Sequence, residues 1–331
     1  MTPPPTALIG HGYWGRNLAR NLNALGALAA IVESDATSRK AAGEAYPKAP
    51  CHESVDAVLA DPSIKAVMIA TPAATHGALV ARALEAGKHV FVEKPLCLDV
   101  TEAERLAADA ARRGLTLMVG HLLLYHPAFV ALKACVAEGR LGRLRYVYST
   151  RLSLGKIRRE ENALWSFAPH DISMILQLMG GLPERVIAAG GQYLHAGVAD
   201  TTLSHLAFPG DVQAHIFVSW IHPYKDQRLV VVGDKAMAVF NDVSPGPEKL
   251  LIYQHEARWD GTVPVVSKAE AEPIPYETVE PLRREVETFL AAAVGGPRPP
   301  SDAREGIAVL RVLDACQRAL VSGNPVEMAH G

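Results

Sequence analysis

The sequence Ala-Leu-Ile-Gly-His-Gly-Tyr-Trp-Gly-Arg occupies residues 7–16 and decides the fold of the first half of the chain. An apolar run typical of a buried strand leads into Gly-x-Gly-x-x-Gly, and a helical pattern follows over residues 16–25. The glycines let the main chain approach a pyrophosphate, which the amino terminus of the helix attracts. The residues that we expect to contact a dinucleotide here are Gly10, Gly12, Tyr13, Trp14 and Gly15.

In such a fold, a carboxylate at the end of the second strand binds the ribose 2′-hydroxyl of NAD and repels the 2′-phosphate of NADP. Glu33 ends the apolar run that begins at Leu28 and meets this requirement. Asp35 is a second candidate, although it is at least as well placed to cap a helix over residues 36–45. The sequence therefore favours NAD over NADP, with Glu33 as the ribose contact.

Working outward, apolar runs alternate with amphipathic segments as far as about residue 120, which is typical of βαβ units and a parallel sheet. The predicted strands are residues 7–10, 28–33, 66–70, 89–93 and 115–119, with helices at 16–25, 75–87 and 101–114. Longer strands joined by short turns follow at 144–153, 186–193, 201–208, 212–221 and 229–232, which predicts an antiparallel sheet. Helices return at 281–294 and 302–321. We therefore expect an α/β dinucleotide-binding domain over residues 1–121 and an α+β domain over residues 122–331, with terminal helices that can pack on either.

Composition limits the partners. The 331 residues carry 33 basic and 35 acidic side chains, so the chain lacks the strong charge expected of a nucleic-acid or anionic-membrane binder. Four widely spaced cysteines form no zinc or disulfide motif, and no uninterrupted apolar run approaches the roughly 18 residues of a spanning helix. These features predict a cytoplasmic protein with a small-molecule substrate and no metal.

Two segments carry groups able to move a proton. Lys94 follows an apolar run at residues 89–92, so it lies at the carboxyl end of a parallel strand, where open α/β sheets bind ligands. His170 follows Pro169, which we expect in the first turn of a helix that stops at residues 180–181. Histidine titrates near neutral pH, whereas a lysine acts as a base only after its pKa falls by about three units. Lys94 and His170 are the predicted catalytic residues.

Other polar residues lie near the same strand ends. Thr71 and Pro72 end one strand and Glu93 ends another, and all three are predicted cofactor contacts. His76 either touches the cofactor or simply begins a helix. His121 and Tyr125 follow the last strand of the first domain and are candidates for substrate contact. Asp171 fits either substrate chemistry or a favourable charge at a helix amino terminus.

The glycine fingerprint, the Glu-Lys-Pro segment and the later histidine resemble, in identity and order, the Gfo/Idh/MocA family of sugar and cyclitol oxidoreductases. Residues 12–17, 120–127, 165–171 and 223–225 resemble the branch that acts on UDP-N-acetylated sugars. This resemblance implies an NAD(P)-binding Rossmann domain and a second domain whose large, open, mostly antiparallel sheet lines the substrate site. It also implies homodimers or homotetramers.

The activity implied by the resemblance is NAD-dependent oxidation of a C3 hydroxyl in a UDP-N-acetylated sugar, UDP-N-acetylglucosamine in the first place. The 3-keto product would serve the synthesis of amino sugars, lipopolysaccharide or lipid A precursors. The predicted substrate contacts are His121, Tyr125, Arg151, Lys156, Ser166, Asp171, Tyr224 and Lys225. At least half of the cations among residues 151–159 and 225–228 are expected to be solvated rather than bound to the diphosphate, with Lys156 and Lys225 as the best candidates for phosphate contact.

One position departs from the family pattern. Ser166 stands one helical turn before His170, where the family often has an aspartate. Serine forms hydrogen bonds but holds no charge at neutral pH, so the general-base role should fall to Lys94 and His170 alone. Two alternatives stay open: an oxidoreductase for the corresponding glucuronate nucleotide, another sugar or a cyclitol, and a non-catalytic NAD-responsive binding protein.

Overall fold

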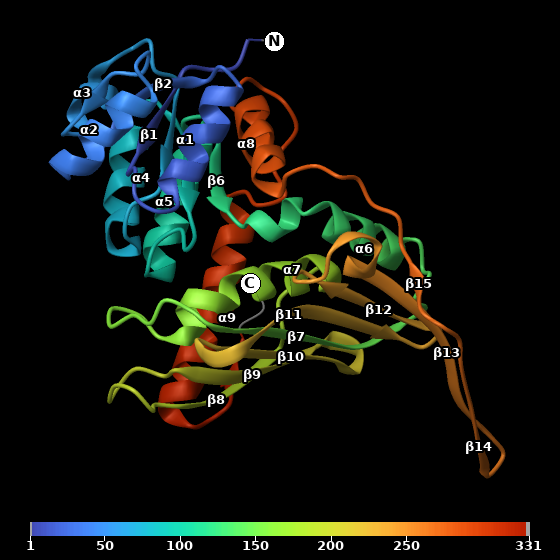
Figure 1. Ribbon diagram of the computed structural model, residues 1–331. Helices are drawn as coiled ribbons and strands as arrows, with labels where there is room; N and C mark the ends of the chain where they lie inside the picture. Colours follow the sequence, from blue (N-terminus) through green and yellow to red (C-terminus); the bar gives the residue numbers. More distant parts are fainter. Residues whose placement is uncertain (1, 329–331) are drawn as a thin grey trace. The chain divides into compact units, whose positions relative to one another are not determined.

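The computed structural model describes residues 2–328, which form two compact units. The first unit joins the residues up to Tyr125 to Val279–Leu310. The second consists of His126–Thr278 and the chain from Arg311 onward. Residues 279–310 thus belong to the first unit although they follow most of the second unit in the sequence. The boundary between Leu310 and Arg311 lies inside helix α9 (Ala303–Ser322). Figure 1 labels the elements of both units.

The first unit is built on a six-stranded parallel sheet in the order β3-β2-β1-β4-β5-β6. Its strands are β1 (Thr6–Ile9), β2 (Leu28–Val32), β3 (Cys51–His52), β4 (Ala66–Ile69), β5 (His89–Glu93) and β6 (Leu117–Gly120). Its helices are α1 (Gly15–Ala24), α2 (Ala36–Ala45), α3 (Asp56–Ala60), α4 (His76–Glu85), α5 (Val100–Arg112) and α8 (Pro281–Ala292). β1, β4 and β6 are buried throughout, as in parallel sheets covered on both faces. The predicted α/β dinucleotide-binding fold is confirmed.

The second unit contains a ten-stranded sheet in the order β14-β13-β12-β11-β7-β10-β9-β8-β16, with β15 paired to β13. The strands are β7 (Leu144–Leu154), β8 (Arg185–Gly191), β9 (Thr201–Phe208), β10 (Val212–Ser219), β11 (Ile221–Gly233), β12 (Ala236–Asn241), β13 (Leu250–Asp260), β14 (Val263–Lys268), β15 (Glu272–Pro273) and β16 (Val326–Glu327). Every pairing is antiparallel except that of β7 with β10. The predicted large, mostly antiparallel sheet is confirmed.

The two faces of this sheet differ. Helix α7 (Ala163–Met179) packs on β7, β9 and β10, where alternate apolar side chains are buried. On the same strands, Tyr146, Leu203 and Phe217 stay exposed, and Leu203 lies directly opposite Phe217 in the register. Helix α6 (Pro127–Ala137) packs against α7 and β12. Figure 1 also shows β13 and β14 continuing beyond the sheet as a two-stranded ribbon, which the sequence patterns did not predict.

Helix α7 begins earlier than predicted. Asn162 caps it by accepting a hydrogen bond from the main-chain nitrogen of Trp165 at 3.2 Å, and Pro169 lies inside the helix. The prediction that His170 and Asp171 lie at the amino end of this helix was therefore wrong, because Pro169 is not in the first turn. A proline is usually confined to that turn, where its missing N–H costs nothing, but here the packed helix tolerates it further in.

Within residues 2–328, no helix combines the length and apolar character needed to cross a bilayer.

Candidate active site

The glycine fingerprint forms an open cradle at the carboxyl end of β1. Gly10 has a φ of +93°, and a Cβ there would lie 2.7 Å from the carbonyl oxygen of Ala70. A Cβ on Gly15 would lie 2.0 Å from the carbonyl oxygen of Gly10, so α1 packs against the loop too closely for any side chain. Gly12, in contrast, has nothing within 4 Å of its Cβ position. Packing therefore requires two of the glycines, and the third leaves the main chain open toward a ligand.

Glu33 follows β2 and is fixed beside this cradle. Its carboxylate accepts hydrogen bonds from the main-chain nitrogens of His11 at 2.7 Å and Asp35 at 3.0 Å. Asp35 instead caps α2 by accepting a hydrogen bond from the main-chain nitrogen of Ser38 at 2.7 Å. Hydrogen bonds from Ser38 lower the pKa of the Asp35 carboxyl group. Glu33 is therefore the carboxylate that the fold presents to the loop.

Glu93 connects the fingerprint to the Glu-Lys-Pro segment. The indole nitrogen of Trp14 donates a hydrogen bond to the Glu93 carboxylate, and a Cβ on Gly120 would lie 3.0 Å from that carboxylate. Burial raises the pKa of Glu93 to about 7, against the opposing effects of the Trp14 hydrogen bond and the Lys94 charge. Lys94 is the next residue, and its peptide bond to Pro95 is cis. The cofactor loop and Lys94 are thus held at one edge of the sheet.

The segment after β4 completes this edge. The Thr71 methyl group would lie 3.0 Å from a Cβ on Gly10, and the Thr71 hydroxyl is 2.7 Å from that of Thr75. Pro72 follows Thr71 and is exposed. His76 begins α4 with its ring buried, Nε2 2.9 Å from the carbonyl oxygen of Thr71 and Nδ1 2.7 Å from that of Pro95. The structure thus brings the predicted cofactor residues together, while their contact with NAD stays a prediction.

Two buried polar contacts join the segment after β6 to residues 301–305. His121 Nδ1 is 2.6 Å from the Glu305 carboxylate, and the Tyr125 hydroxyl is 2.7 Å from that of Ser301. Burial raises the pKa of Tyr125 far above its ordinary value. His121 and Tyr125 are almost completely buried and hold partners within the first unit. Their predicted contact with substrate stays a prediction.

Glu285 of α8 is a further buried polar residue of the first unit and was not identified from the sequence. It is fully buried, and neither carboxylate oxygen has a hydrogen-bond partner within the described part of the chain. Burial, with repulsion from Glu93, raises its pKa well above the ordinary value. The available signal was a charged residue inside the apolar stripe of a helix, flanked by Leu282, Val286 and Phe289.

The predicted residues of the second unit centre on α7. Arg151 of β7 and Asp171 form a buried, bidentate ion pair, with nitrogen–oxygen distances of 2.7 and 3.2 Å. Asp171 therefore anchors α7 to the sheet beside His170, and it does not act on the helix dipole. Ser166 is buried one turn before the half-buried His170. The predicted catalytic residues Lys94 and His170 belong to different units.

Gln317 of α9 holds the start of α7 and was also missed from the sequence. Its side-chain oxygen accepts hydrogen bonds from the Asn162 amide at 2.8 Å and the Trp165 indole at 3.0 Å. No local pattern marks a glutamine that acts on a helix so distant in the sequence.

The remaining predicted substrate contacts lie at the surface of the second unit. Lys156 is exposed in the segment between β7 and α7, and Tyr224 and Lys225 are exposed on β11. Arg228 is engaged by Asp226 through nitrogen–oxygen distances of 2.6 and 2.7 Å, a pairing that the sequence did not predict. Lys156 and Lys225 thus keep the exposure that a phosphate contact requires.

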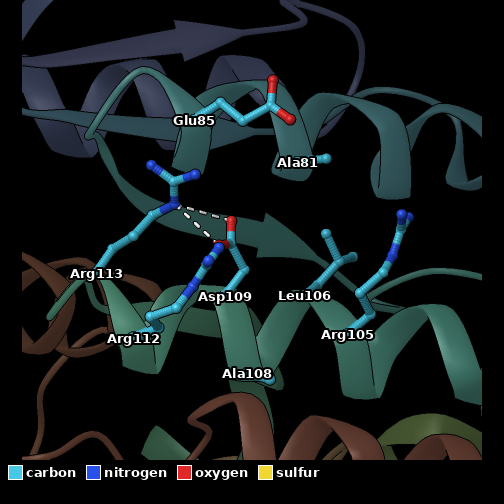
Figure 2. Close-up of a pocket in the computed structure, with 8 residues that line it drawn as sticks. All are labelled: Ala81, Glu85, Arg105, Leu106, Ala108, Asp109, Arg112 and Arg113. Carbon is cyan, nitrogen blue, oxygen red and sulfur yellow. Dashed lines mark hydrogen bonds and ion pairs between the residues drawn. The ribbon is translucent and has the colours of Figure 1, made fainter.

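A separate groove of about 400 Å³ lies between α4 and α5 (Figure 2). Arg105, Arg112 and Arg113 line it, and both Arg112 and Arg113 bond to Asp109. None of the predicted site residues lines this groove. It is therefore not the crevice at the carboxyl edge of the sheet.

Comparison with known proteins agrees with this geometry. Residues 5–121 match the oxidoreductase family with an NAD-binding Rossmann fold, and residues 129–239 match the GFO/IDH/MocA C-terminal domain. The chain is 30% identical over 318 residues to UDP-N-acetylglucosamine 3-dehydrogenase of Acidithiobacillus ferrooxidans, covering 96% of each protein. It belongs to the Gfo/Idh/MocA family. Residues 5–121, in the first unit, are the family's NAD-binding domain, and the protein is an NAD-dependent oxidoreductase.

Solved structures and a further curated relative extend the comparison. The solved structure of the Acidithiobacillus enzyme superposes with a TM-score of 0.83 at 28% identity, covering 96% of this chain and 97% of that one. The crystal structure of an oxidoreductase from Magnetospirillum magnetotacticum superposes with a TM-score of 0.82 at 33% identity, covering 95% of this chain and 99% of that one. Inositol 2-dehydrogenase of Rhizobium meliloti is 27% identical over 97% of this chain and 98% of its own length.

The residues present fit NAD. The open main chain at Gly12 leaves room for a pyrophosphate beside the start of α1, and the fixed Glu33 carboxylate offers an acceptor for a ribose hydroxyl. Among residues 2–328, no three His, Cys, Asp or Glu side chains are grouped closely enough to hold a metal ion.

Proposed function

We propose that this oxidoreductase oxidises the C3 hydroxyl of a UDP-N-acetylated sugar, with UDP-N-acetylglucosamine as the best candidate, to the 3-keto sugar nucleotide. The supporting observation is the 30% identity to UDP-N-acetylglucosamine 3-dehydrogenase along nearly the whole of both chains. Exposed Lys156 and Lys225 supply the cations that a diphosphate needs. Amino-sugar, lipopolysaccharide or lipid A precursor synthesis would use the product.

The chemistry requires a group that takes the hydroxyl proton. Bound NAD⁺ would supply the hydride acceptor, and a hydride leaves carbon readily only as the attached oxygen gains alkoxide character. Lys94 follows directly on the carboxyl end of β5, beside the fingerprint loop, and His170 is half-buried on a helix anchored by the Arg151–Asp171 pair. We assign the general-base role to these two residues, since Ser166 cannot hold a charge.

A substrate panel tests the proposal. UDP-N-acetylglucosamine, its glucuronate analogue, UDP-glucose and myo-inositol are each incubated with the protein and NAD⁺ while NADH absorbance is followed. We expect the first to be turned over with the highest kcat/KM. A preference for myo-inositol would contradict the proposal in favour of a cyclitol dehydrogenase, a reading that the inositol 2-dehydrogenase relative supports. NAD binding without turnover of any compound would favour a binding protein.

Replacement of the two catalytic candidates tests the residues. Lys94→Ala and His170→Ala should each lower kcat by about 10²- to 10⁴-fold, the usual contribution of a positioned acid or base, while NAD affinity is kept. Lys65→Ala and His195→Ala, at exposed positions, are the matched controls. Near-normal turnover in both catalytic variants would refute the assignment.

We also propose a homodimer or homotetramer. The exposed apolar side chains Tyr146, Leu203 and Phe217 on the outer face of the large sheet support association through that face.

A further inference from the structure

His76 has a position that its predicted role does not explain. Its ring is 1% exposed and lies between two main-chain carbonyl groups, those of Thr71 and Pro95. Thr71 follows β4, and Pro95 follows Lys94 at the end of the neighbouring strand β5. The imidazole therefore spans the two segments that leave adjacent strands at the carboxyl edge of the sheet.

The chemistry of the ring limits what it can do there. Carbonyl oxygens only accept hydrogen bonds, and a neutral imidazole carries one N–H, so each tautomer donates to one of the two carbonyls. Burial lowers the pKa of His76, and the charge of Lys94 lowers it further, against the opposing effect of the two carbonyls. The neutral ring therefore donates to one carbonyl at a time, and only a protonated ring donates to both.

The two segments have different attachments. Thr71 packs against Gly10 of the fingerprint loop, so its main chain is fixed relative to the cofactor cradle. Pro95 is bonded to Lys94, so its main chain fixes where the lysine side chain starts. A ring held at 2.7 and 2.9 Å from these carbonyls sets the spacing between cradle and lysine.

We propose that His76 is a positioning residue that holds Lys94 in place in the cofactor crevice, because its ring occupies the space between the main-chain carbonyls of Pro95 and Thr71 and donates a hydrogen bond to one of them. This proposal rests on the proposed catalytic role of Lys94. It differs from direct cofactor contact, because His76 acts here through the lysine and not on NAD.

Two replacements separate the positioning role from loss of folding. His76→Leu removes the hydrogen-bond donor between the two segments, and we expect kcat to fall by up to about 10²-fold, the usual cost of a misplacement of about 1 Å. His76→Gln keeps a donor and should recover part of that loss. NAD affinity should change less than about threefold in both, because the cradle itself is intact. His89→Leu, at the opposite end of β5, is the control and should leave kcat unchanged.

A second measurement does not depend on the substrate. The acylation rate of the Lys94 amine is followed by mass spectrometry of its peptide, with exposed Lys65 as the internal reference. We expect the Lys94 rate to shift at least about threefold in His76→Leu while the Lys65 rate is unchanged. The thermal unfolding midpoint of each variant identifies any that fail to fold, in which case His76→Gln alone is used.

The outcomes are distinct. Unchanged Lys94 acylation and unchanged kcat would overturn the proposal. A parallel fall in NAD affinity and kcat would also overturn it, in favour of direct cofactor contact. If the unmodified protein turns over no UDP-sugar, the substrate assignment fails, and the acylation rates still decide the role of His76.

Discussion

Glu93 and Glu285 are two carboxyl groups whose pKa values are higher in the folded protein than in the unfolded chain. Such groups bind more protons when folded, so their contribution to stability is fully present below the unfolded pKa. It is lost as the pH rises through the folded pKa. For Glu93 this window runs from 4.5 to about 7, and for Glu285 the loss also begins near 4.5. The free energy of unfolding of the first unit should therefore fall as the pH rises from 5 to 8.

Glu285→Gln removes one of the two groups. The variant cannot ionise at this position and no longer repels Glu93, so its free energy of unfolding should fall less between pH 5 and pH 8. The difference is at most about 1.4 kcal/mol per pH unit for one proton. Urea unfolding at several pH values measures it. Glu287→Gln, at an exposed position paired with Arg283 on the same helix, is the control, and equal pH slopes in both variants would contradict the assignment.

At the level of single residues, the sequence predicted the site residues whose positions depend on a local pattern. The glycines of the fingerprint and Glu33 could be placed because strand, turn and helix follow one another within a short segment. The Arg151–Asp171 pair, the tie between Gln317 and Asn162, and the burial of Glu285 could not, because each partner comes from a distant segment that only tertiary packing brings near.

At the scale of elements, the start of α7 is the most informative case. Asn162 caps this helix through its side-chain oxygen and binds Gln317 through its side-chain nitrogen. Asn162→Ala removes both bonds and should lower the free energy of unfolding by about 1–2 kcal/mol. Asn162→Asp keeps the cap acceptor and loses only the donor, so its loss should be smaller. Thermal unfolding of both variants tests this, with Asp99→Ala at the cap of α5 as reference.

The same helix shows where sequence patterns fail. β5 and β9 have the predicted bounds, because apolar and turn residues mark their ends. Pro169 suggested that α7 begins near residue 169, but the helix begins after its cap residue Asn162. The packing contacts of a buried helix outweigh the cost of a proline in its interior. An Asx cap, where one precedes an apolar run, should therefore take precedence over a later proline.

At the scale of the whole molecule, the first unit depends on residues 279–310. Phe289 of α8 packs edge-on against Phe91 of β5 at a centroid distance of 5.8 Å, and Glu305 and Ser301 hold His121 and Tyr125. A polypeptide ending at residue 125 should therefore lack a cooperative unfolding transition and bind no NAD. Fusion of residues 279–310 through a flexible linker should restore both. Circular dichroism and NAD titration measure the outcome, and full NAD affinity in the shorter chain would contradict it.

The edge strand β6 of the first unit also depends on residues 301–302. The main-chain nitrogen of Val119 bonds to the carbonyl oxygen of Ser301, and Met118 forms a bridge with Asp302, so residues 301–302 cover the open edge of the parallel sheet. During translation at roughly 5–20 residues per second, β6 leaves the ribosome on the order of ten seconds or more before its cover is made. During that interval the unpaired main-chain groups of β6 are open to pairing with another polypeptide chain. We therefore expect the nascent chain to bind its cofactor only after residues 279–310 have been synthesised.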